Sequence, residues 1–402
     1  MTKEQRALLT ILRHGIDPNT TLPEADFCDW AAVLAEARQQ AVSLFAYEVI
    51  SGMKDRLPEE VVKDLSDYGM RRIARNMAVM NSQRKLAAIM KDRPYVILKG
   101  EAAAAYYPKP ELRSLGDVDF LVEKQTYAHL HELFTQMGFS SPEHQNDHHT
   151  TYRTPTGVLE MHYEPPGIPT GAQEGPVREY LADLLSTRQT RESAFGSFPV
   201  PEDRLHGLIL LLHMQHHMLS EGIGLRHLMD WGCFVAATAE KPFWEESLLP
   251  LLKKVGLFTY CAVMTKTCAL QLGTPCPCWA QDADEALCDE VLADILEGGN
   301  FGRKDTLRAT SAHMVSDSGK SGTKRSKLGN LWAVFHRSVA ARYPVVKKYP
   351  VLYLVFYPIK AVRYIFLMLT GKRGSLAKAL PQATVRRQLY GKLHIFEETK
   401  NG

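Results

Sequence analysis

Apolar side chains in the first part of the chain recur every three or four residues, which is the period of an amphipathic helix. The spacing is clear from Asp29 to Ile50 and starts again after Pro58. Asp29 stands directly before the first of these runs, and aspartate is a favoured residue type at a helix N-cap. The pattern predicts a helical lead-in over residues 1–92.

After Pro94 the pattern changes to short apolar runs that alternate with helix-favouring segments. Tyr95–Leu98 is β-branched and apolar, as a buried strand would be. Pro155-Thr156-Gly157 separates two later strand-like runs and has the turn chemistry of a hairpin. The elements expected in this core, residues 93–165, are a strand at 95–98, a helix at 101–107, a strand at 117–122, a helix at 125–137 and hairpin strands at 148–154 and 158–163.

The rest of the chain is predicted to be mainly helical. Residues 166–202 carry several Pro and Gly residues and are expected to be a connection with one helix near 177–186. A helical domain at 203–300 follows, then a polar basic linker at 301–330 and a basic, aromatic helical tail at 331–402. The strands are thus confined to one region, and the expected fold class is α+β, with a small mixed sheet among helices.

Composition excludes several classes of protein and reveals one asymmetry. With 402 residues, 45% of them hydrophobic, and a formal net charge of +3, the chain is not disordered, collagen-like or a small disulfide scaffold. Seven cysteines and no leading basic-plus-apolar signal predict a reduced, cytoplasmic setting. Arg303–Phe396 holds 19 Lys and Arg against 2 Asp and Glu, a net charge of +17, whereas residues 1–302 carry −13.

The basic tail contains an apolar, aromatic stretch from Tyr349 to Thr370. A membrane-spanning helix needs about 20 mostly uncharged residues, and Pro358, Lys360 and Arg363 interrupt this stretch. Two interpretations remain. One is a helical tail packed on the core, which we favour slightly; the other is a segment within 331–396 that lies on an anionic membrane surface and makes the protein peripheral to the membrane. Nucleic-acid binding stays open, although no recognised motif for it accompanies the basic residues.

Three acidic residues are the strongest candidates for chemistry. Asp117 and Asp119 lie two apart on an expected strand, so both carboxylates project from one face. Glu160 lies on the second arm of the hairpin and can converge on this pair. Neighbouring carboxylates repel each other unless divalent cations neutralise them, and three such groups can hold the metal ions of a phosphoryl-type transfer. By spacing alone, the alternative is a pair of solvated acids at the start of a strand.

The turn after the first strand supplies a complementary, phosphate-binding part. Gly100 allows main-chain amides to approach a phosphate. Lys99 and Arg113 can pair with phosphate charge, the arginine in a bidentate way. With these residues nearby, a metal site at Asp117 and Asp119 is favoured over a pair of solvated acids.

The same residues carry a resemblance to a known family. Its pattern is LKG, then Tyr-Pro, then R-x-x-x-D-hydrophobic-D, and later E-hydrophobic-H. This chain has Leu98-Lys99-Gly100, Tyr107-Pro108, Arg113-Ser114-Leu115-Gly116-Asp117-Val118-Asp119 and Glu160-Met161-His162. Over about residues 29–235 it resembles the uncharacterised bacterial nucleotidyltransferase family, which belongs to the DNA polymerase beta-like nucleotidyltransferase superfamily.

The resemblance implies a two-metal transfer of a nucleoside monophosphate from a nucleoside triphosphate to an acceptor that the sequence does not identify. The implied catalytic acids and ligands of Mg²⁺ or Mn²⁺ are Asp117, Asp119 and Glu160. The implied nucleotide-binding residues are Lys99, Gly100 and Arg113. Many superfamily members have Gly-Ser where this chain has Gly100-Glu101, so a serine contact to the triphosphate is missing.

Two other functions stay open at this point. A non-catalytic membrane-associated or scaffold protein could keep this fold and act through its basic tail. A nucleotide-dependent phosphotransferase or toxin would transfer a phosphoryl group instead of a nucleotidyl group.

Accessory candidates come mainly from the helical domain. His213, His216 and His217 share one helical face, and the next helix carries Arg226 and Asp230. These side chains either face the nucleotide or form a packing network, and we favour the network. His162 either lines the site or orients Glu160. Zinc binding by Cys276 and Cys278, with Cys268 and Cys288 nearby, is disfavoured because structural zinc usually takes cysteine pairs two to four residues apart.

Overall fold

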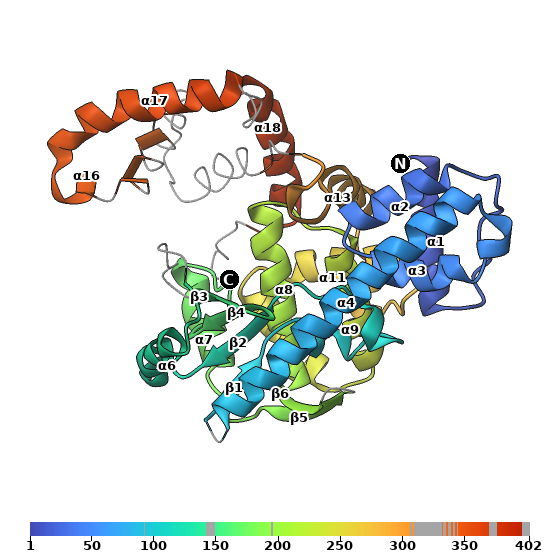
Figure 1. The fold of residues 1–402 in the computed structure, drawn as a ribbon, viewed down its shortest axis with the longest axis horizontal. Coiled ribbons are helices and arrows are strands. Elements are labelled where there is room, and N and C mark those ends of the chain that lie inside the picture. Colours follow the sequence, from blue (N-terminus) through green and yellow to red (C-terminus); the bar gives the residue numbers. More distant parts are fainter. Residues whose placement is uncertain are drawn as a thin grey trace.

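Helices form most of the molecule, and one small mixed sheet lies among them (Figure 1), which confirms the predicted α+β fold. The structure is a computed structural model. It describes residues 1–91, 93–141, 149–193, 196–305, 308, 332, 335–336, 339–340, 342–343, 345–369 and 376–395. Most of the linker expected at 301–330 lies outside the described residues.

Four helices precede the sheet. They are α1 (Lys3–Ile16), α2 (Trp30–Gln39), α3 (Ser43–Ser51) and α4 (Glu59–Met90), with a 3₁₀ turn, η1 (Lys54–Arg56), before α4. Asp29 caps α2 as expected, because its carboxylate accepts hydrogen bonds from the main-chain N–H groups of Ala31 and Ala32 at 2.9 and 3.3 Å. α4 contacts β2 and β4 as well as α2 and α3, so it links the sheet to the other N-terminal helices (Figure 1).

The main sheet has four strands in the order β1-β2-β4-β3. The strands are β1 (Tyr95–Ile97), β2 (Val118–Val122), β3 (His149–Thr154) and β4 (Gly157–His162). β2 runs parallel to β4, and the other neighbours are antiparallel. The intervening elements are α5 (Glu101–Ala104), η2 (Pro110–Leu112) and α6 (Lys124–Gln136). The helix expected at 101–107 is therefore shorter, and Pro108 and Pro110 follow it closely.

The connection after the sheet contains more structure than the sequence indicated. After η3 (Gly171–Gln173) and α7 (Glu174–Tyr180), the strands β5 (Gln189–Ser193) and β6 (Gly196–Val200) form a two-stranded hairpin. The prediction of a single helix near 177–186 was wrong in its bounds and missed this hairpin. β5 contains only polar side chains, so the apolar alternation that identifies a strand is lacking.

The helical region extends to about residue 302. Its elements are α8 (Asp203–Leu219), α9 (Leu225–Thr238), the π-helical turn η4 (Trp244–Leu248), α10 (Leu249–Lys254), α11 (Phe258–Leu272), α12 (Cys278–Gln281), α13 (Glu285–Gly298) and η5 (Asn300–Gly302). Its apolar side chains join those of the N-terminal helices in one core, which includes Leu8, Leu12, Trp231 and Tyr260. Val96 and Leu121, on one face of the sheet, belong to this core. A second core lies between the opposite face of the sheet, with Ile97 and Phe120, and the helices α4 and α6.

The C-terminal helices are placed differently from each other. α16 (Val345–Lys348), η6 (Pro350–Leu352) and α17 (Tyr353–Leu369) form an arm that projects from the body, whereas α18 (Leu376–Lys392) returns to it (Figure 1). Arg386 Nη2 and Tyr390 Oη of α18 donate hydrogen bonds to the Met218 carbonyl at 2.7 and 2.5 Å. Among the described residues, no helix combines the length and apolar character needed to cross a bilayer.

Candidate active site

The register of two parallel strands brings the predicted acids together. Asp119 of β2 is paired in register with Glu160 of β4, and Leu121 is paired with His162. Since alternate residues of a strand share a face, Asp119, Glu160 and His162 lie on the same face of the sheet. One ligand atom from each lies within 4.8 Å of the other two. Asp117 lies directly before β2 and is not part of this group of three. Together with Asp119 and Glu160 it lines a cavity that is described below.

The electrostatics of this group fit a divalent cation. Burial, and then the negative charges of Asp119 and Asp117, raise the pKa of Glu160 to about 8. Burial and the charge of Asp119 likewise raise the pKa of Asp117. His162 Nε2 lies 3.3 Å from Asp119 Oδ1 and 3.9 Å from Glu160 Oε2. A hard cation held by these carboxylates would relieve their mutual repulsion, and the imidazole nitrogen is an acceptable further ligand.

Lys99 partly neutralises this cluster in the structure. Its Nζ lies 2.7 Å from Asp119 Oδ1 and 3.0 Å from His213 Nε2. Burial acts to raise the pKa of Asp119, but Lys99 and His162 outweigh burial and lower it. Gly100 follows with φ of 66°, a conformation that favours glycine, so the turn at the end of β1 depends on this residue.

Arg113 is held inside the protein. Its Nε and Nη2 each donate a hydrogen bond of 2.7 Å to the Asp230 carboxylate, and Tyr107 Oη donates another of 2.7 Å to Asp230 Oδ1. Asn76 of α4 fixes the loop that follows Arg113, because it accepts a hydrogen bond from the Leu115 N–H at 2.9 Å and donates one to the Arg113 carbonyl at 2.8 Å. The loop before Asp117 is thus tied to α9 and α4.

Two of the three α8 histidines, His213 and His217, both line the cavity and pack in a cluster of rings, whereas His216 contacts the His217 ring and does not line the cavity. His213 and His217 line the cavity, and their Nε2 atoms are 2.9 Å apart. Their rings pack against His227 of α9, and the rings of His217 and His227 also contact Phe301. Asp230 pairs with Arg113 rather than with a histidine, so the packing network that we expected involves a different partner.

Buried histidines make the stability of the protein depend on pH. Burial lowers the pKa of His206 to about 4 and that of His217 to about 2, and it also lowers those of His213 and His227. An unfolded chain protonates these side chains below about pH 6.5, so it binds more protons than the folded protein does. We expect the free energy of unfolding to fall between pH 7.5 and pH 5.5, by up to about 1.4 kcal/mol per pH unit for each histidine.

Urea denaturation of the full chain at pH 7.5, 6.5 and 5.5 measures this effect. The raised pKa values of Asp117, Glu101 and Glu160 act in the opposite direction, but these are three groups against five histidines, because burial also lowers the pKa of His216. His206→Gln should flatten the dependence, whereas His129→Gln, at an exposed position, should leave it unchanged. An equal free energy of unfolding at pH 5.5 and 7.5 would contradict the prediction.

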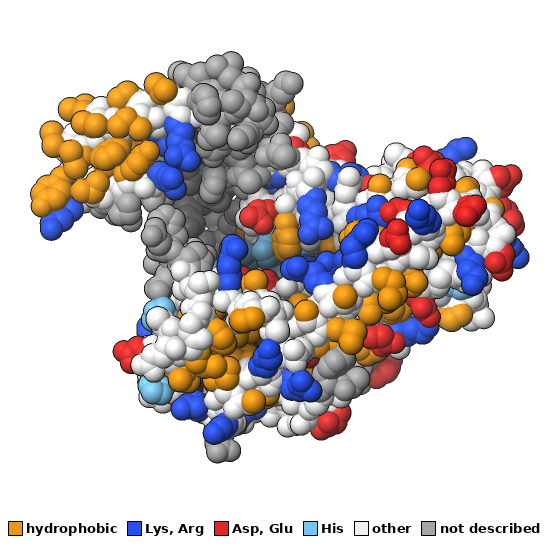
Figure 2. Space-filling view, viewed as in Figure 1, with side chains coloured by type: hydrophobic (Ala, Val, Ile, Leu, Met, Phe, Trp, Pro, Cys, Tyr) orange, Lys and Arg blue, Asp and Glu red, His pale blue; other side chains and the backbone are white. Residues whose placement is uncertain are grey.

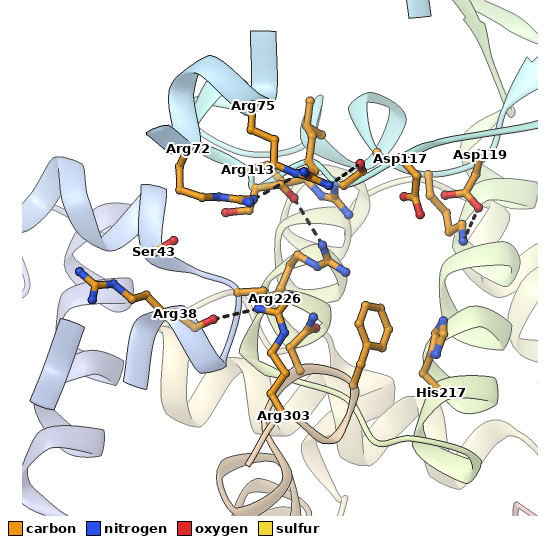
Figure 3. A pocket seen from close by; sticks show the side chains of 18 of the residues that line it. Arg38, Ser43, Arg72, Arg75, Arg113, Asp117, Asp119, His217, Arg226 and Arg303 are labelled. Carbon is orange, nitrogen blue, oxygen red and sulfur yellow. Dashed lines mark hydrogen bonds and ion pairs between the residues drawn. The ribbon is translucent and has the colours of Figure 1, made fainter. Parts of the chain in front are cut away.

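A cavity of about 420 Å³ opens beside the acids (Figure 3). Its lining includes several residues that sequence reasoning missed: Arg38, Arg72, Arg75, Phe301 and Arg303. The arginines of α2 and α4 looked like ordinary charges of amphipathic helices, and no motif singled them out. Only Phe301 carries a local signal in the sequence, because Gly298, Gly299 and Gly302 surround it; in the structure it has a φ of 57°.

Glu101 and the cysteines were the two other features that the sequence singled out. Glu101 is buried and accepts a hydrogen bond from Gln83 of α4, and it does not line the cavity. All seven cysteines are free thiols. Within the described part of the chain, none of them belongs to a cluster that could hold a metal ion.

The match to a protein-family model confirms the family that the motifs predicted. The chain belongs to a family of uncharacterised nucleotidyltransferases, whose model matches residues 27–273. Among solved structures it is similar to the crystal structure of an antigenic nucleotidyltransferase-like protein from Paracoccidioides brasiliensis, with 16% sequence identity, 52% of this chain and 97% of that chain covered, and a TM-score of 0.29. A comparison with curated proteins gives no match.

Proposed function

We propose that the protein transfers a nucleoside monophosphate from a nucleoside triphosphate to an acceptor, with the help of divalent cations. The observation that carries this proposal is the convergence of Asp119, Glu160 and His162 within 4.8 Å, next to Asp117 and a cavity. The family supports the same activity. Bound Mg²⁺ or Mn²⁺ would neutralise charge on the reacting phosphate oxygens.

Each side chain then has a distinct role. Asp117, Asp119 and Glu160 hold the cations, and His162 supports Asp119 or adds a ligand. The alternative role for Glu160 is that of a general base, which accepts the proton of the attacking acceptor group instead of holding a cation. Lys99 and the Gly100 turn contact the triphosphate. The Arg113 guanidinium donates two hydrogen bonds to the Asp230 carboxylate. We therefore assign Arg113 the role of positioning the loop before Asp117 instead of binding phosphate.

Incubation of the full chain with each labelled triphosphate, Mg²⁺ or Mn²⁺, and cell extract tests the function. The expected result is a labelled acceptor whose mass rises by a nucleotidyl group. A mass increase of one phosphoryl group would instead establish the phosphotransferase alternative. Absence of label with every nucleotide, or equal labelling by an Asp117→Asn/Asp119→Asn double variant, would contradict both.

A second role, at a membrane surface, is favoured by the arm that carries α17. Five apolar side chains of η6 and α17 are strongly exposed: Val351 (71%), Leu354 (74%), Val355 (52%), Ile359 (46%) and Val362 (67%). Figure 2 shows this apolar surface on the projecting arm, and the exposed side chains of Lys348 and Arg363 accompany it. We propose that the arm lies on an anionic lipid surface, with its apolar side chains inserted and its basic residues near the headgroups.

Sedimentation with vesicles tests the lipid interaction. The parent protein should pellet with vesicles that contain phosphatidylserine and far less with neutral phosphatidylcholine vesicles. A Leu354→Asp/Val362→Asp variant should bind at least about tenfold more weakly, because each inserted apolar side chain contributes roughly 1.5–3 kcal/mol. Met70→Asp, at an exposed position of α4, is the control. A parent protein that stays in solution with anionic vesicles would exclude this role.

A further inference from the structure

Four arginines gather along the wall of the cavity that lies away from Asp119 (Figure 3). Arg72 and Arg75 come from α4, Arg226 comes from α9, and Arg303 follows η5. These residues, called here the arginine cluster, are far apart in sequence and meet only in the folded protein.

The arginine cluster forms no ion pair with any acidic side chain that the structure describes. Within the described part of the chain, no carboxylate oxygen lies within 4.0 Å of any of the four guanidinium groups. The other two arginines of the cavity differ, since Arg38 pairs with Asp64 and Arg113 pairs with Asp230. Among the described residues, no direct ion pair neutralises these four groups, although the charges of Asp230 and Asp117 act on Arg226 from farther away.

Main-chain carbonyls provide only weak contacts for these groups. Arg72, Arg75 and Arg226 donate to the carbonyls of Leu115, Gly116 and Ser114 at 3.3, 3.4 and 3.5 Å, respectively. Arg303 donates to the Arg38 carbonyl at 3.2 Å. These distances exceed the 2.9–3.0 Å typical of N–H···O hydrogen bonds. Each of the four arginines thus has one main-chain contact of this kind, and all four line the cavity that a ligand can enter.

Two of the arginines also contain buried donors without a hydrogen-bond partner among the described residues. The Nε atoms of Arg72 and Arg226 are inaccessible to solvent and make no hydrogen bond. Leaving such a group unsatisfied costs roughly 1–3 kcal/mol. Burial lowers the pKa of Arg72, and the charges of Arg75 and Arg303 act in the same direction. The protein therefore holds a strained set of like charges that an anion would relieve.

We propose that the arginine cluster is a phosphate-binding subsite. Guanidinium groups bind phosphate oxygens in a bidentate manner, and several together suit a group that carries more than one negative charge. The inference deepens the proposed function, because the subsite shares its cavity with the metal-binding acids. The bound phosphate is either the distal part of the triphosphate or a phosphate group on the acceptor.

Anion binding without metal tests the subsite separately from catalysis. Isothermal titration of the full chain with inorganic phosphate, pyrophosphate and tripolyphosphate in EDTA should show binding that strengthens with anion charge. Arg72→Ala/Arg303→Ala should weaken tripolyphosphate binding at least about tenfold, since each charged contact contributes roughly 1.5–3 kcal/mol. Arg71→Ala/Arg84→Ala removes the same charge from exposed positions of α4 that do not line the cavity, and should bind like the parent.

The outcomes separate this inference from the proposed function. No binding of any of the three anions, or an equal loss in the control variant, would overturn the subsite. Transfer activity does not enter this measurement, so an inactive protein that still binds tripolyphosphate through Arg72 and Arg303 would refute only the proposed function. Circular dichroism and thermal unfolding verify that both double variants are folded.

A second titration, with ATP and Mg²⁺, identifies the source of the phosphate. If Arg72→Ala/Arg303→Ala weakens ATP binding but leaves AMP binding unchanged, the cluster holds the triphosphate tail. If ATP binding is unchanged while inorganic phosphate binding is lost, the cluster holds a phosphate of the acceptor. Both results support the subsite, and the second would identify the acceptor as a phosphorylated compound.

Discussion

Replacing Asp119 by asparagine is expected to lower the rate of nucleotidyl transfer by about 10³-fold or more. Asparagine keeps the shape of the side chain but removes the charge that holds a cation and pairs with Lys99. Metal ligation supplies several kcal/mol of transition-state stabilisation, and each 1.4 kcal/mol corresponds to a factor of ten in rate. The measurement is the initial rate of label transfer at saturating triphosphate and Mg²⁺.

Asp67→Asn is the matched control for this variant. Asp67 is exposed on α4 and does not line the cavity, so the same chemical change there should leave the rate within about twofold of the parent. Thermal unfolding should show that Asp119→Asn is folded. A folded Asp119→Asn protein with a rate within threefold of the parent would remove Asp119 from the metal site.

Replacing Asp230 by alanine is expected to lower the free energy of unfolding by about 3–5 kcal/mol. This carboxylate receives two hydrogen bonds from Arg113 and one from Tyr107, all in the interior. Burial opposes the charge on Arg113, but Asp230 outweighs burial and raises the pKa of this guanidinium. Without Asp230, the charge of Arg113 would be buried and unpaired, which is the costly situation for an internal ion pair.

Urea denaturation of the two proteins at pH 7 measures this loss. Asp289→Ala, at an exposed position of α13, is the control and should change the free energy of unfolding by less than about 0.5 kcal/mol. A loss below 1 kcal/mol in Asp230→Ala would show that Arg113 finds another partner or reaches solvent. It would also weaken the role of Arg113 as the residue that positions the loop before Asp117.

The acids were predictable because strand alternation is a local property. Spacing of two residues in Asp117 and Asp119 sets their shared direction wherever the strand lies. The pairing of Asp119 with Glu160 is not local, since it depends on β2 lying parallel to β4 rather than to another strand. The sequence placed Glu160 on the correct hairpin arm, but the register that brings the carboxylates side by side was visible only in the fold.

The ion pair of Arg113 with Asp230 could not be predicted from residue type. An arginine four residues before an acidic motif suits phosphate binding, yet its partner Asp230 is 117 residues away on another helix. Arg72 and Arg75 show the converse. Their charges look like the solvated face of a long amphipathic helix, and only the contact of α4 with the sheet and the loop at 113–117 places them in the cavity.

The order of strands and helices within residues 93–165, the acidic motif, the glycine turn and the basic tail were determined by the sequence alone, because periodicity, turn chemistry and charge act over a few residues. The tertiary structure decided which side chains meet: Glu160 beside Asp119, Asp230 beside Arg113, and Arg72, Arg75, Arg226 and Arg303 around one cavity. Contacts of this kind join segments separated by forty to more than two hundred residues, so they are fixed by the packing of the whole core.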